Sequence, residues 1–193
     1  MKLAYSVVAA ALAVGFCGAA FAQTGTVQRD VNQQQRIEQG LQSGQLNTRE
    51  ASRLENEEAR VERDQSRAMK DGKLSPQEKA RLQREQNQVS RDIYREKHDA
   101  QTGNPNSASS QRMQADVQRN VNQQRRIEQG VQSGSLTTRE AGRLEGGESH
   151  ISKKEARAGS DGKVTSHEQA RVQKTENRES RRIYREKHDG QKK

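Results

Sequence analysis

Apolar residues recur along this chain at the spacing of helices that bury one face. Between residues 27 and 93 they form three successive stripes, whose members are Val27, Val31, Ile37, Leu41, Leu54, Val61, Ala68, Leu82, Val89 and Ile93. Steps of three, four or seven residues dominate once Gln34 is included, which is typical of amphipathic helices. The seven-residue steps of the second stripe are also typical of coiled coils. The pattern predicts three helices in this part of the chain.

Each stripe is separated from the next by a helix stop followed at once by a helix start. Residues 71–78 read Asp-Gly-Lys-Leu-Ser-Pro-Gln-Glu, and related turns occur at 43–50, 133–140 and 161–168. The glycine favours the left-handed conformation that ends a helix. Ser, Thr or Asn at the fifth place, with Glu at the eighth, forms a capping box for the next helix. We therefore expect a helix–turn–helix hairpin at each turn.

A tandem repeat accounts for most of the chain. Residues 29–100 align without a gap with residues 119–190, and more than half of the aligned positions are identical. The sequence therefore predicts an all-α protein of two tandem three-helix modules. The expected organisation is a signal peptide at 1–22, module 1 at 23–100, a flexible linker at 101–112, and module 2 with a basic tail at 113–193.

The second module carries a weaker version of the same pattern. Gly146 and Gly147 interrupt its second predicted helix, and Glu179 stands where the first module has Val89. Each interior glycine costs a helix about 1 kcal/mol relative to alanine. We expect the second module to be the less stable of the two.

The first 22 residues have the features of a secretory signal peptide. Lys2 precedes a long apolar run, and Ala20-Phe21-Ala22 forms a cleavage site of small residues. Cleavage would start the mature chain at Gln23, remove Cys17 and leave no membrane-spanning segment. The expected location is the periplasm or the extracellular space, and the mature chain would contain no disulfide.

Composition limits the size of the core. About one mature residue in eight is Val, Ile, Leu or Phe, a level that also allows disorder until a partner binds. The formal net charge is +9, and the positive excess lies in the second module. It predicts attraction to anionic surfaces. Acidic and basic residues alternate along the helices, as is typical of a solvated face with pairs four residues apart.

The repeated turn resembles the second half of an EF-hand calcium loop. Gly72, Leu74, Ser75 and Glu78 match its sixth, eighth, ninth and twelfth places. The resemblance implies weak calcium binding, with the candidate ligands Asp71, Ser75, Glu78, Asp161, Thr165 and Glu168. The first loop place, which should be acidic, is Arg67 in this turn, and the capping box explains Ser75 and Glu78 without a metal. We favour the capping role.

The segment Ile-Tyr-Arg-Glu-Lys-His-Asp occurs at 93–99 and again at 183–189. It provides the candidate partner contacts Tyr94, Lys97, His98, Tyr184, Lys187 and His188. In a purely structural interpretation, which we favour, the tyrosine seals the core while lysine and histidine face the negative end of the helix dipole. His and Asp could also ligate a borderline metal, but one histidine in each module does not complete such a site.

No pattern of catalytic residues is present, and the chain lacks the apolar bulk for a dry active-site pocket. The scarcity of aromatic residues argues against specific nucleic-acid binding. We expect a non-enzymatic, exported helical-repeat protein that engages another protein or an anionic envelope component, with a second copy as a further possible partner. The alternative is a low-affinity divalent-cation binder, and apart from weak calcium we expect no cofactor.

Overall fold

The computed structural model describes the backbone of residues 17–190 and the side chains of residues 25–190. Most of the predicted signal peptide, residues 1–22, and the end of the basic tail lie outside the described residues. The described chain forms six helices and no strands: α1 (Cys17–Ser43), α2 (Thr48–Ala68), α3 (Pro76–Lys97), α4 (Ala108–Ser133), α5 (Thr138–Ala158) and α6 (Ser166–Lys187). The all-α prediction is confirmed. None of these helices is both long and apolar enough to cross a membrane.

The turns between the helices are built as the sequence predicts. The turn glycines Gly44, Gly72, Gly134 and Gly162 have φ values of 75°, 86°, 72° and 88°, which lie in the left-handed region. Complete capping boxes start α2, α3, α5 and α6. Pro76 lies at the start of α3, where its missing N–H costs no hydrogen bond. The turns within each three-helix unit are therefore determined by local chemistry.

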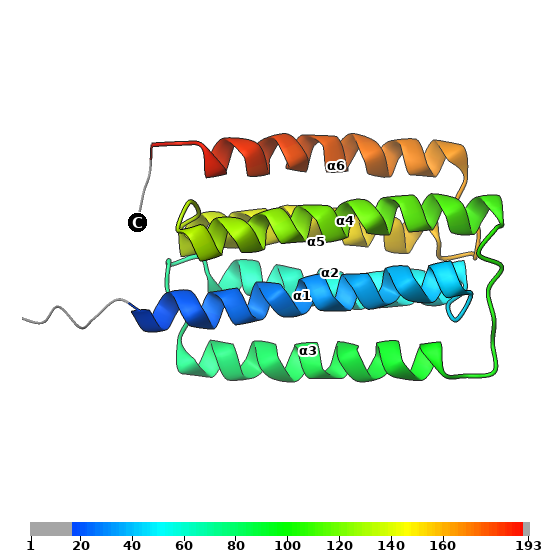
Figure 1. Ribbon diagram of the computed structural model, residues 1–193, viewed down its shortest axis with the longest axis horizontal. Helices are drawn as coiled ribbons and strands as arrows, with labels where there is room; N and C mark the ends of the chain where they lie inside the picture. Colours follow the sequence, from blue (N-terminus) through cyan, green and yellow to red (C-terminus); the bar gives the residue numbers. More distant parts are fainter. Residues whose placement is uncertain (1–16, 191–193) are drawn as a thin grey trace, which may run out of the picture.

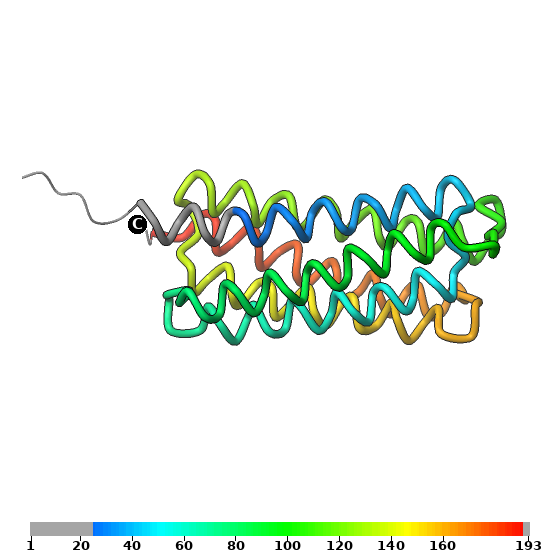
Figure 2. The backbone as a smooth tube through the Cα atoms, turned by 90° about the horizontal axis from the view of Figure 1, so that it is seen from below, coloured from blue at the N-terminus to red at the C-terminus, as the bar shows by residue number. Residues whose placement is uncertain are grey.

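The two units, α1–α3 and α4–α6, pack against each other as one long bundle (Figures 1 and 2). Helices α1, α2, α4 and α5 form its centre, while α3 and α6 lie on opposite flanks. One cluster of buried apolar residues draws members from both units, including Ile37, Leu54, Ile151 and Val172. The repeats therefore share a core.

Helices α2 and α5 run antiparallel along a seam of small residues. Ser52 Oγ donates to the carbonyl of Ala156 at 2.8 Å, and Ser149 Oγ donates to the carbonyl of Ala59 at 2.7 Å. A Cβ at Gly142 would lie 2.6 Å from Cβ of Met69, so only glycine fits there. The expected interruption at Gly146 and Gly147 does not occur, because α5 continues unbroken to Ala158.

The contacts between the repeats are reciprocal. Arg49 Nη2 donates to the carbonyl of Asp161 at 3.0 Å, and its counterpart Arg139 donates to the carbonyl of Asp71 at 3.3 Å. Such an exchange is the mark of a self-complementary interface with an approximate twofold axis. The two repeats of this chain therefore pack against each other as two identical subunits pack in a homodimer.

The linker is shorter than expected and is packed against the bundle. Helix α4 begins at Ala108, so residues 108–112, which we expected in the linker, are helical. The backbone N–H of Gly103 donates to the carbonyl of Gly44 at 2.8 Å. A Cβ at Gly103 would lie 2.4 Å from the carbonyl oxygen of Leu46, so the linker passes close to this turn because it carries glycine there.

Candidate functional site

The predicted calcium-binding residues of the first repeat form a helix cap. Ser75 donates to Glu78 Oε2 from its backbone N–H at 2.9 Å and from its hydroxyl at 2.6 Å. Asp71 Oδ1 accepts the backbone N–H of Lys73 at 2.9 Å. The structure thus joins Ser75 to Glu78 while Asp71 closes its own turn. Calcium binding by this set remains a prediction.

The second set is arranged in the same way. Thr165 donates to Glu168 Oε2 from its backbone N–H at 2.9 Å and from its hydroxyl at 2.7 Å, and Asp161 Oδ1 accepts the N–H of Lys163 at 2.9 Å. The two hydrogen bonds from Thr165 lower the pKa of Glu168, because they stabilise its ionised form.

The predicted partner contacts lie at opposite ends of the bundle. Tyr94 stacks on His98, and Tyr184 on His188, each with ring centroids 4.1 Å apart. The expectation that these tyrosines seal the core is wrong, since Tyr94 is 60% exposed and Tyr184 is 58% exposed. The preceding isoleucines are buried instead, because adjacent residues on a helix face different directions.

The lysines of this segment lie against the first helix of their own repeat. Lys187 Nζ donates to the carbonyl of Arg126 at 3.1 Å. Partial burial lowers the pKa of both Lys97 and Lys187, and the neighbouring Arg36 and Arg126 add to the effect. Tyrosine and histidine are therefore presented outward, while each lysine is partly enclosed.

An acidic trio that sequence reasoning missed lies at each end of the bundle. The carboxylates of Glu50, Glu96 and Asp99 approach within 4.8 Å of one another. The second repeat forms the equivalent trio from Glu140, Glu186 and Asp189. Burial raises the pKa of Glu50, and the charges of Asp99 and Glu96 raise it further. Calcium takes six to eight oxygen ligands, so three carboxylates supply only part of such a shell.

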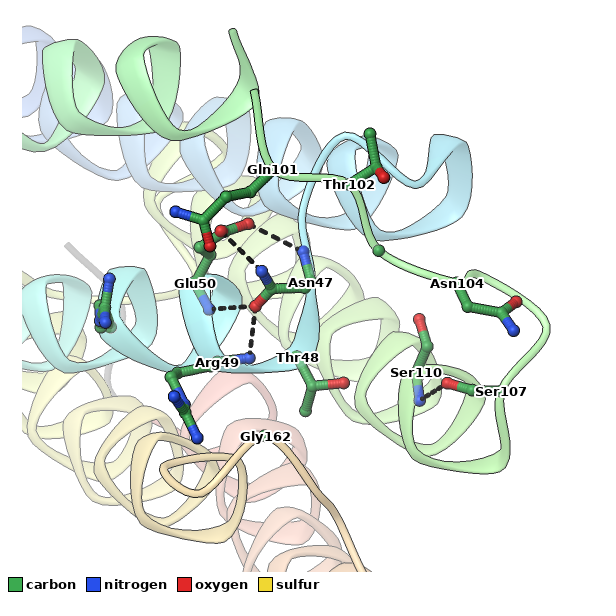
Figure 3. Close-up of a pocket in the computed structure, with 12 residues that line it drawn as sticks. Asn47, Thr48, Arg49, Glu50, Gln101, Thr102, Asn104, Ser107, Ser110 and Gly162 are labelled. Carbon is green, nitrogen blue, oxygen red and sulfur yellow. Dashed lines mark hydrogen bonds between the residues drawn. The ribbon is translucent and has the colours of Figure 1, made fainter. Parts of the chain in front are cut away.

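A polar pocket of about 350 Å³ opens where α2 begins, beside the linker and the α5–α6 turn (Figure 3). Asn47 Oδ1 accepts the backbone N–H groups of Arg49 and Glu50, both at 3.0 Å. At the edge of the pocket, Ser107 Oγ accepts the N–H of Ser110 at 3.1 Å. These polar groups stabilise the starts of α2 and α4.

Charge in this protein is sorted between the inside and the outside. Within the described part of the chain, every lysine and arginine is at least partly exposed. The exposed acidic residues there are only Asp71, Asp99, Asp161 and Asp189, at turns and helix ends. The expectation of a mixed, solvated helix face holds for a few pairs, such as Arg81 with Glu85, but is wrong for the many acids that are buried. The outer surface is more basic than the net charge indicates.

The acids occupy the interior in a group that we call the carboxylate core. Its members are Asp30, Glu55, Glu58, Glu62, Asp116, Glu145, Glu148, Glu155, Glu176 and Glu179, all buried. A signal for it exists in the sequence. Glu55, Glu58 and Glu62 recur at helical spacing beside Leu54 and Val61, on the face that the apolar stripe marks as internal.

Hydrogen bonds connect this core across the two repeats. Gln124 Nε2 donates to both Glu62 Oε1 and Glu145 Oε2 at 3.2 Å, and Ser152 Oγ donates to Glu62 Oε2 at 2.9 Å. Gln34 Nε2 donates to Glu55 Oε2 at 3.1 Å, and Asn120 Nδ2 donates to Glu155 Oε2 at 2.6 Å. The donors in these bonds are amides and a hydroxyl on neighbouring helices, because a carboxylate can only accept.

Other oxygens of the core have no hydrogen-bond partner in the described structure. Both carboxylate oxygens of Glu58 and both of Glu148 are in this condition. Burying an ionised carboxylate without a partner is so costly that the group becomes protonated instead. The interior is therefore set up to hold neutral carboxylic acids.

The pKa values follow from this environment. Burial raises the pKa of Asp30, Glu55, Asp116 and Glu179 to about 7, and that of Glu176 to about 8. Burial and neighbouring acids together raise the pKa values of Glu58, Glu62, Glu145, Glu148 and Glu155 well above their usual range. Basic side chains lower these pKa values only at the edge of the carboxylate core, where Arg119 Nε lies 2.7 Å from Glu176 Oε2.

Comparison of the chain with models of protein families, with characterised proteins and with solved structures finds no match.

Proposed function

We propose that this protein is an exported, non-enzymatic binding protein whose basic exterior attaches to an anionic component of the cell envelope. The sorting of charge carries this proposal. Because the acids are internal, they neither pair with most of the outer bases nor repel an approaching anion. The outside of the bundle therefore acts as a polycation.

Helix α6 gives the most uniform basic face. The exposed charged residues within α6 are all basic: Arg171, Lys174, Arg178, Arg181 and Arg185. At 1.5 Å per residue this row is about 20 Å long. The buried acids of α6 contact partly buried arginines instead, since Glu176 pairs with Arg119 and Glu179 with Arg182.

The exposed aromatic residue of α6 supports an envelope lipid surface as the partner. Tyr184 lies between Arg181 and Arg185 in the sequence and is exposed with them. Tyrosine is favoured at the boundary between lipid and water, because its ring is apolar and its hydroxyl is polar. Nucleic-acid binding is less well supported, because base stacking uses a platform of several aromatic rings. The described surface exposes only Tyr94 and Tyr184 as large apolar side chains.

The test is co-sedimentation of the purified protein with lipid vesicles. We expect binding to vesicles that contain phosphatidylglycerol and little binding to phosphatidylcholine alone, with affinity falling steeply as salt is added. Binding that is equal for the two lipids, or unaffected by salt, would contradict the proposal.

A further inference from the structure

The two repeats differ in the groove between their second and third helices. In the second repeat the groove between α5 and α6 has a volume of about 480 Å³. The equivalent space between α2 and α3 measures about 130 Å³. Equivalent residues are 90 apart in the sequence, so each difference between the grooves can be assigned to a substitution.

Ion pairs close the groove of the first repeat. Asp64 on α2 accepts from Arg81 on α3 at 2.8 Å and from Arg67 at 3.4 Å. Arg81 also pairs with Glu85 at 2.8 Å. The acids and bases of this wall neutralise one another, and Leu82 fills the floor.

The second repeat replaces the residues that close this groove. Lys154 stands in place of Asp64, Thr175 in place of Glu85, and Arg178 in place of Gln88. The floor residue Leu82 is replaced by the smaller Val172. Lys154 Nζ donates to Thr175 Oγ1, so a hydroxyl contact replaces the ion pairs between the helices.

The charge of the open groove is strongly positive. The bases that line it are Lys154, Arg157, Arg171, Lys174 and Arg178. The lining also contains one acid, Glu168, whose carboxylate already accepts two hydrogen bonds from Thr165. Five exposed cations around a concave surface repel one another, and an anion bound between them would offset that repulsion.

We infer that the groove between α5 and α6 binds the phosphate group of an anionic envelope lipid. Guanidinium groups match phosphate oxygens with pairs of parallel hydrogen bonds, and lysine adds a point charge. The buried Ala158 and Val172 supply an apolar floor. This inference rests on the proposed function, and it assigns the binding to one repeat and one groove.

The first repeat supplies the test variant. The pair Lys154→Asp and Thr175→Glu introduces the closing residues of the first repeat and changes the charge by three. The control pair, Arg91→Asp and Gln83→Glu, makes the same change on exposed positions of α3, on the opposite flank. Circular dichroism melts establish that both variants are folded before their binding to phosphatidylglycerol vesicles is measured.

We expect the groove variant to bind phosphatidylglycerol vesicles about a hundredfold more weakly, which is roughly a factor of five for each unit of charge changed in the groove. The affinity of the control variant should fall far less, because its changes lie outside the groove. In the reverse experiment, Asp64→Lys with Glu85→Thr should open the first groove and strengthen binding. Equal losses of vesicle affinity in the groove and control variants would overturn the assignment of binding to this groove while leaving the proposed function intact.

Two further outcomes separate the possible failures. If the unmodified protein does not distinguish phosphatidylglycerol from phosphatidylcholine, the proposed function and the groove fail together. If inorganic phosphate binds in titration calorimetry with the same dependence on Lys154 while the vesicles do not bind, the lipid assignment is overturned in favour of free phosphate.

Discussion

One buried hydrogen bond between an acid and an amide occurs in both repeats, but the acid and the amide have exchanged positions. In the first repeat Gln65 donates to Asp30 at 2.7 Å, and at the same place in the second repeat Asn120 donates to Glu155 at 2.6 Å. Acid and amide have changed helices, and the bond persists because a carboxyl and a carboxamide have nearly the same shape. Volume is exchanged as well, since Glu57 and Val89 correspond to Gly147 and Glu179.

The exchange of volume gives a prediction at this scale. A Cβ at Gly147 would lie 2.1 Å from the carboxyl carbon of Glu179, so Gly147→Ala should cost about 1–3 kcal/mol through overpacking, offset by the roughly 1 kcal/mol that alanine returns to the helix. In a Glu179→Val background the same change should stabilise the protein by up to about 1 kcal/mol, because the obstructing carboxyl is gone and only the helix gain remains. Urea unfolding of the four proteins measures this coupling, and equal costs in the two backgrounds would contradict it.

At the scale of elements, the sequence determines where helices start and stop because those signals are local. Gly72, Ser75 and Glu78 specify a turn through neighbours only, and the structure builds it as predicted. The outward face of Tyr94 and the burial of Glu58 were not predicted. Both depend on which faces of α2 and α3 pack against other helices. On α2, acids lie on the same buried face as leucine and valine, so the hydrophobic pattern marks that face, but not the acids themselves, as internal.

The caps give a prediction for the helices. Glu78→Ala removes the acceptor of both hydrogen bonds from Ser75, and it should lower the free energy of unfolding by about 1 kcal/mol. Because we assign Glu78 a capping role, millimolar calcium should not change the thermal midpoint of either protein. Circular dichroism melts measure both effects, and a calcium-dependent rise that vanishes in Glu78→Ala would restore the EF-hand interpretation.

At the scale of the whole molecule, the shared core explains how a chain poor in large apolar residues can fold. The two repeats cover each other, and buried glutamic acids of α2 and α5 occupy the interior together with the small residues of the seam. The sequence predicted two tandem modules joined by a flexible linker, with no pairing between them. The pairing of repeats could not be predicted from local signals, since it depends on contacts between residues far apart in the chain.

This core predicts an unusual dependence of stability on pH. The folded pKa values of its acids are raised above the unfolded values near 4, so folding binds protons. Their contribution is present in full below about pH 4 and is lost as pH rises through 7 to 8. The urea midpoint should therefore be higher at about pH 5 than at about pH 8.

The matched variant for this test replaces Glu58 and Glu148 with glutamine, which has the shape of the protonated acid. Its midpoint should vary less with pH and should exceed that of the unmodified protein at about pH 8. The control, Asp71→Asn with Asp161→Asn, changes exposed acids and should keep the original slope. A urea midpoint that rises with pH in the unmodified protein would refute the proposal that the acids of the carboxylate core are neutral when folded.

Because the acids of the carboxylate core bind protons as the chain folds, the hydrogen ion is a stoichiometric reactant in folding. A chain that reaches its destination unfolded at neutral pH arrives with ionised glutamates, and it removes hydrogen ions from solution as the repeats close on each other. By mass action, acidification then acts on this protein as a tight ligand acts on others. Refolding in unbuffered solution should make that solution more alkaline, and acid titration back to the starting pH would count the hydrogen ions taken up.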